Sequence, residues 1–137
     1  MIVLRRSSER LHLARSEQQS WLTFYPQEPP EQSTEGFGVL IGLDEIRMPP
    51  DGGSASCPTE EAEIVTYVYR GALAQEDSTG SSGVVQAGEF QRMNIRPGIR
   101  HKESNASRTD WANVFLIALR PSEVGLVRPH EQQRFGS

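Results

Sequence analysis

The sequence is poor in several features that would define a protein class. It has one cysteine among 137 residues, Cys57, so no disulfide can form within the chain. No apolar run approaches the length of a membrane-spanning helix, and the N-terminus turns polar after four residues, unlike a signal peptide. Fourteen basic residues stand against eighteen acidic ones, so the basic surface of a dedicated nucleic-acid binder is absent. These features predict a cytoplasmic protein without membrane partners and disfavour nucleic acid as a partner.

Strand-forming patterns dominate what is present. Short segments rich in β-branched and aromatic residues alternate with clusters of Gly, Pro, Asp and Ser, which is typical of an all-β sandwich or barrel. Helix signals are few, and the chain has the length of one domain, residues 1–137. The stretch around residues 18–36 is rich in Pro, Glu and Gln, and we expect it to form a surface loop. The segments that read as strands are GFGVLIGLDEIRM, EIVTYVYRGAL, GVVQAGEFQRMNI and ANVFLIALRP.

A histidine and a carboxylate follow a Pro-Gly corner in the segment RPGIRHKESN. His101 and Glu103 are two residues apart, and residues i and i+2 of a β-strand point to the same side. Imidazole and carboxylate groups are common metal ligands, so this pair predicts half of a metal site. A positioned carboxylate can also act as a general base, which makes Glu103 a candidate catalytic group.

Five segments, in order along the chain, resemble the pirin family of cupins, which includes bacterial pirin-like quercetinases. They are MIVLRRSSER, EGFGVL, EAEIVTYVYRGALAQEDSTG, AGEFQRMNIRPGIRHKESN and RPHEQQRF. The resemblance implies a double-stranded β-helix, that is, a cupin or jelly-roll barrel, corresponding to the first of the family's two cupin domains. It also implies that residues 128–137 correspond to the linker between those domains.

The family resemblance further implies a metal site built from a His-x-His pair, a later His and a later Glu. The later ligands fall on His101 and Glu103, whereas Cys57 and Thr59 replace the paired histidines. Glu63 stands where a glutamate follows the pair in the cupin pattern, and it is a second candidate base. We therefore expect either no cofactor or a single divalent metal ion (iron, nickel or zinc) held by His101, Glu103 and Cys57.

Two functions follow from this reading. The first is a pirin-like module with a degenerate metal site, which binds a small molecule or a protein partner with weak or no catalysis. The alternative is a metal-dependent oxygenase that resembles quercetin 2,3-dioxygenase and acts on an enolic or flavonoid substrate. Because two-domain pirins pack one cupin against the other, we also expect a homodimer, in which the tail beginning at residue 128 could reach the partner chain.

Overall fold

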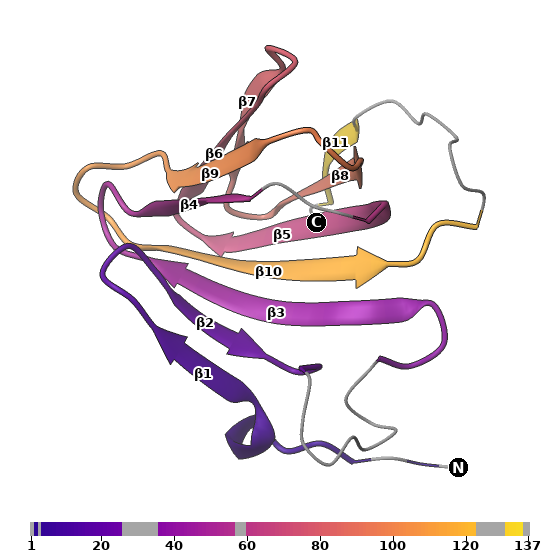
Figure 1. Cartoon of the computed structure of the whole chain (residues 1–137). Coiled ribbons are helices and arrows are strands. Elements are labelled where there is room, and N and C mark those ends of the chain that lie inside the picture. Colours follow the sequence, from indigo (N-terminus) through magenta and orange to yellow (C-terminus); the bar gives the residue numbers. More distant parts are fainter. Residues whose placement is uncertain (1, 3, 26–35, 57–59, 123–130, 136–137) are drawn as a thin grey trace.

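The computed structural model of the chain describes residues 2, 4–25, 36–56, 60–122 and 131–135. Apart from a short 3-10 helix at Ser7–Glu9, the regular elements described are all strands, in two antiparallel sheets (Figure 1). The larger sheet has the order β1-β2-β3-β10-β5-β8-β11, and the smaller one has the order β4-β9-β6-β7. The all-β prediction is confirmed. The strands are β1 Leu11–Ala14, β2 Gln19–Leu22, β3 Leu40–Met48, β4 Gly53–Ser56, β5 Ala62–Arg70, β6 Ala72–Asp77, β7 Ser82–Gln86, β8 Glu89–Ile95, β9 His101–Asn105, β10 Ala112–Leu119 and β11 Glu131–Arg134.

Four predicted strand segments form the centre of the structure. β3, β10, β5 and β8 lie side by side in the larger sheet, and β10 pairs with both β3 and β5 along most of its length. Buried residues alternate along these strands, as at Thr66 and Val68 of β5, so one face of the sheet packs inward. The smaller sheet contributes Leu73 and Val85 to the shared core. The hydrophobic core therefore lies between the two sheets.

The predicted loop over residues 18–36 is wrong at its N-terminal end. Residues Gln19–Leu22 form β2, which pairs with β1 on one side and β3 on the other. Ser20 is buried, and His12 of β1 stacks on Trp21 of β2 with ring centroids 4.7 Å apart. The polar composition of this segment suits strands at the margin of a sheet, where only one face is covered. Residues 26–35, the rest of that loop, lie outside the described residues.

Part of the C-terminal tail forms a strand. Glu131–Arg134 form β11, which pairs antiparallel with β8 of the same chain. Gln132 donates from Nε2 to the backbone carbonyl of Val84 at 2.9 Å, so β11 also contacts β7 of the smaller sheet. These contacts lie within one chain, and the expectation that the tail reaches a partner stays a prediction.

The smaller sheet holds the segment on which the site prediction rests. β9 lies between β4 and β6, and the sheet faces the inner side of β5 and β8 (Figure 1). At the turn from β5 to β6, Gly71 has φ +77° and a Cβ there would lie 2.5 Å from the Trp111 carbonyl oxygen, so glycine is required. Among the described residues, no helix has the length and apolar character needed to cross a membrane.

Candidate functional site

The candidate site is built on the first half of β9. His101 is the register partner of Ser56 in β4 and of Asp77 in β6, and Glu103 is the register partner of Gln75 in β6. Directly opposite residues in an antiparallel pair point to the same face, so the neighbouring strands bring these side chains together. His101 and Glu103, which are predicted to share a face, both line one cavity.

The imidazole of His101 is buried with an unused ring nitrogen. Only 9% of the residue is exposed, and its Nε2 atom has no hydrogen-bond partner. A buried polar atom without a partner is uncommon in a folded protein and indicates a place for a ligand, a metal ion or water. Asp77 lies across the strand pair, and its pKa is lowered first by the Thr79 hydroxyl hydrogen bond and, in smaller part, by the charge of His101.

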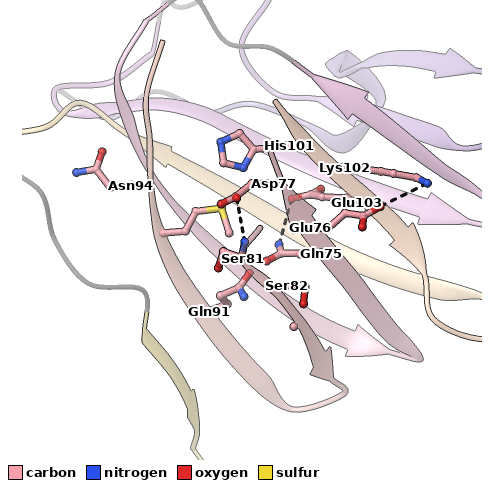
Figure 2. Close-up of a pocket in the computed structure, with 12 residues that line it drawn as sticks. Gln75, Glu76, Asp77, Ser81, Ser82, Gln91, Asn94, His101, Lys102 and Glu103 are labelled. Carbon is pink, nitrogen blue, oxygen red and sulfur yellow. Dashed lines mark hydrogen bonds and ion pairs between the residues drawn. The ribbon is translucent and has the colours of Figure 1, made fainter. Parts of the chain in front are cut away.

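The carboxyl group of Glu103 is held by an amide. Gln75 donates from Nε2 to Glu103 Oε1 at 3.2 Å (Figure 2). Burial raises the pKa of Glu103, and the hydrogen bond from Gln75 opposes this only in part. Because burial favours the neutral form, Glu103 can take up a proton more readily than an exposed carboxylate, as a general base must.

A cavity of about 110 Å³ opens in front of these groups. The side chains drawn in Figure 2 come from β6, β8 and β9, from the turn after β6 at Ser81, and from the start of β7 at Ser82. The lining combines uncharged polar side chains with charged ones, and the charged side chains of Glu76 and Lys102 are each 61% exposed. The other lining residues are Gln75, Glu76, Asp77, Ser81, Ser82, Gly83, Gln91, Met93, Asn94 and Lys102.

The remaining predicted site residues are placed differently. Cys57 and Thr59 lie outside the described residues, but Ser56, which immediately precedes Cys57, is the register partner of His101. Glu63 lies on β5 opposite Asn94 of β8, and it is not among the residues that line the cavity. The structure thus brings His101 and Glu103 to one cavity, whereas Glu63 is opposite a lining residue, Asn94, without lining the cavity itself.

The chemistry of the described residues matches part of a metal site. An unpartnered His101 Nε2 and a carboxylate oxygen of Glu103 are donor types that a divalent metal accepts. Within the described ranges, however, no group of three or more His, Cys, Asp or Glu side chains is close enough to hold a metal ion. A complete site would need further donors, such as Cys57 or water.

The glutamines of the cavity were not predicted from the sequence. Gln75 and Gln91 are 7% and 2% exposed, which is unusual for glutamine. The available signal was alternation in β6, where Leu73 and Gln75 occupy positions of the same parity and therefore face the same side. A glutamine at an inward position of a strand is a candidate ligand-contacting residue.

Asn105, at the other end of β9, serves the fold. Its Nδ2 atom donates to the backbone carbonyls of Met48 at 3.3 Å, Pro49 at 3.1 Å and Asp110 at 2.7 Å. Its Oδ1 atom accepts from the Ser107 backbone N–H at 2.8 Å. With both ends of the amide in use, this side chain joins the β3–β4 turn to the loop after β9.

Comparison with known proteins places this arrangement in a family. The family model described as Pirin matches residues 6–117. A protein of Escherichia coli K12 named quercetin 2,3-dioxygenase is 36% identical over 135 residues, covering 98% of this chain and 58% of that protein. A pirin-like protein of Caulobacter vibrioides is 33% identical over 89 residues, covering 65% of this chain and 38% of that protein.

A solved structure gives the same result for the fold. The crystal structure of the bacterial pirin YhhW from Escherichia coli in complex with nickel(II) superposes with a TM-score of 0.86 and 34% identity. The match covers 99% of this chain and 59% of that one, so the chain spans less than two thirds of these relatives. The cupin-type double-sheet fold predicted from the sequence is confirmed, and the chain belongs to the pirin family.

Proposed function

We propose that the chain is a pirin-family binding module whose cavity takes a small molecule beside a weakened divalent-metal site, with weak or no catalysis. The observation that carries the proposal is the pairing of a buried, unpartnered His101 Nε2 with Glu103 in one cavity, while Cys57 and Thr59 replace the paired histidines of the family pattern. Fewer imidazole donors should lower metal affinity, because the number and type of ligands set it.

The metal, where bound, would be held by His101 and Glu103 with Cys57 as the third protein ligand. A relative's structure contains nickel(II), which favours a divalent ion such as nickel, iron or zinc. Such an ion supplies Lewis acidity that polarises a ligand oxygen. The chain's own contribution is to exclude bulk water from the imidazole, to hold the Glu103 carboxyl by the Gln75 amide, and to confine the ligand between the sheets.

The second candidate function is oxygenase activity. It is favoured by the name of the Escherichia coli relative, quercetin 2,3-dioxygenase, and by a buried carboxyl with a raised pKa beside the unpartnered imidazole. In this reaction Glu103 would accept the proton of an enolic hydroxyl, and Glu63 remains a less favoured base because it is not among the residues that line the cavity. Activity of this kind needs a metal to be retained.

Metal content and oxygen consumption separate the two candidates. The full chain would be incubated with Ni²⁺, Fe²⁺ or Zn²⁺, desalted, analysed for bound metal, and then mixed with quercetin under air. We expect well below one metal ion per chain and little oxygen uptake. The variant His101→Ala should abolish the residual metal, whereas Lys102→Ala, which changes an exposed neighbour on the same strand, should not. Stoichiometric metal with sustained oxygen uptake would establish the oxygenase instead.

We further propose that two copies associate through the outer face of the larger sheet. Tyr67 and Phe90 stack there at 4.5 Å, and Phe90 meets Phe135 edge-on at 5.4 Å, with Phe135 63% exposed. A self-complementary apolar surface is well suited to a two-fold dimer. Light scattering at micromolar concentration should give the dimer mass, and Phe135→Ser should lower it. The control Phe37→Ser removes a similarly exposed ring elsewhere and should have no effect. A monomer mass for the unmodified chain would refute the dimer.

A further inference from the structure

The amide of Gln75 has a hydrogen-bond partner at its nitrogen and none at its oxygen. Its Nε2 donates to Glu103 Oε1, while its Oε1 atom is buried and has no hydrogen-bond partner. An ionised carboxylate only accepts hydrogen bonds, and in the structure the amide turns its nitrogen to Glu103 and its oxygen away from it. Gln75 is 7% exposed and lines the cavity, so this oxygen lacks bulk water to satisfy it.

The open oxygen restricts the chemistry of any bound molecule. An amide oxygen accepts only, so it requires a donor such as a hydroxyl group. His101 Nε2, also unpartnered, is the second open atom in the same cavity, and as a ring nitrogen it can accept or donate. Two such atoms in one cavity suit a molecule that carries hydroxyl groups.

The charges around the cavity disfavour anions. Glu103, Asp77 and Glu76 all line it, and the one basic side chain among the lining residues other than His101 is Lys102. Its Nζ lies 3.6 Å from Glu76 Oε1 on the exposed rim, where both side chains are 61% exposed. A carboxylate or phosphate ligand would therefore meet negative charge and an acceptor oxygen instead of donors.

We propose that Gln75 Oε1 is a specificity-determining contact that selects neutral, hydroxyl-bearing ligands over their ethers and over carboxylates. The inference rests on the proposed function, because it requires that a small molecule enters this cavity. It names the residue and the atom that recognise the ligand. A ligand hydroxyl donates to Gln75 Oε1, while Gln75 Nε2 keeps its hydrogen bond to Glu103.

Three small probes test the contact by calorimetric titration of the full chain. Catechol offers two adjacent hydroxyls, 1,2-dimethoxybenzene has the same ring without donors, and benzoate is an anion of similar size. Catechol should bind at least about tenfold more tightly than either of the others, as one lost hydrogen bond to a buried acceptor implies. The variant Gln75→Met keeps a similar length without the amide and should lose about tenfold in catechol affinity. Gln86→Met, at an exposed position of β7, is the matched control and should bind as the unmodified chain does.

A measurement on the unmodified chain tests the proposal even if the variant misfolds. In nuclear magnetic resonance spectra, the side-chain amide signals of Gln75 should shift with catechol and stay in place with dimethoxybenzene. If catechol binds Gln75→Met and the unmodified chain equally while His101→Ala abolishes binding, the cavity is functional and the role of Gln75 is refuted. If none of the probes binds, water alone satisfies these atoms, and both this inference and small-molecule binding in the cavity are overturned.

Discussion

The two halves of β9 use buried polar side chains in opposite ways. At its end, Asn105 satisfies three backbone carbonyls and one backbone N–H, whereas at its start His101 keeps Nε2 without a partner. Both residues are nearly equally buried, 6% and 9% exposed. Burial therefore does not distinguish them, and hydrogen-bond saturation does.

This contrast separates stability from function within five residues of one strand. A saturated buried amide contributes to the folded state, because removing it leaves several buried groups without partners. An unsaturated buried imidazole contributes little to stability and is available to bind. The cavity in front of His101, and the absence of Asn105 from its lining, agree with this division.

The largest expected effect is on stability and concerns Asn105. Asn105→Ala should lower the free energy of unfolding by about 3 kcal/mol, because four hydrogen bonds are lost and buried backbone groups are left unsatisfied. His101→Ala should lower it by less, since no hydrogen bond to Nε2 is lost and the cost is limited to the packing of the ring. Urea unfolding of both variants measures the difference. Equal losses would show that the two side chains share one structural role.

The next effect is on metal affinity at the cavity that contains His101. Cys57→His combined with Thr59→His restores the paired histidines of the family pattern and should raise Ni²⁺ affinity about 100-fold, since imidazole suits this ion. Calorimetric titration with Ni²⁺ measures the change. Thr59→Ala alone serves as the control and should leave affinity nearly unchanged. A folded double variant without tighter binding would mean that the cavity lacks the geometry to bring these ligands together with His101.

The smallest effect concerns a buried carboxyl outside the cavity. Asp44 of β3 lies between Leu22 and Leu116 as its register partners, and burial raises its pKa to about 6. The folded state then binds its proton more tightly than the unfolded state, so stability falls as pH rises from about 4 through about 6. Asp44→Asn removes this loss and should stabilise the protein by about 1–2 kcal/mol at pH 7.5, allowing for partial exposure.

The pH dependence distinguishes this cause from a general gain in packing. At pH 3 the aspartate is protonated in both states, so the difference between the unmodified chain and Asp44→Asn should nearly vanish. Urea unfolding at both pH values is the measurement. An equal stabilisation at pH 3 and pH 7.5 would contradict the assignment.

Strands with a strong local composition could be predicted from the sequence. β5 and β10 are dense in β-branched and aromatic residues, and their strand patterns were evident without any partner. The shared orientation of His101 and Glu103 also followed from sequence, because the two-residue repeat of a strand is a property of the backbone. The motif around these two residues also indicated the family.

Strand pairings between distant segments, and the side-chain contacts across them, were seen only in the tertiary structure. β2 is only four residues long and β11 is entirely polar, and each pairs with a strand distant in sequence, β3 and β8 respectively. The contact between Gln75 and Glu103 joins residues 28 positions apart. Which strands pair, and in which register, depends on the closure of the whole fold, so no local pattern could reveal that an inward glutamine meets this carboxyl and leaves its oxygen open to the cavity.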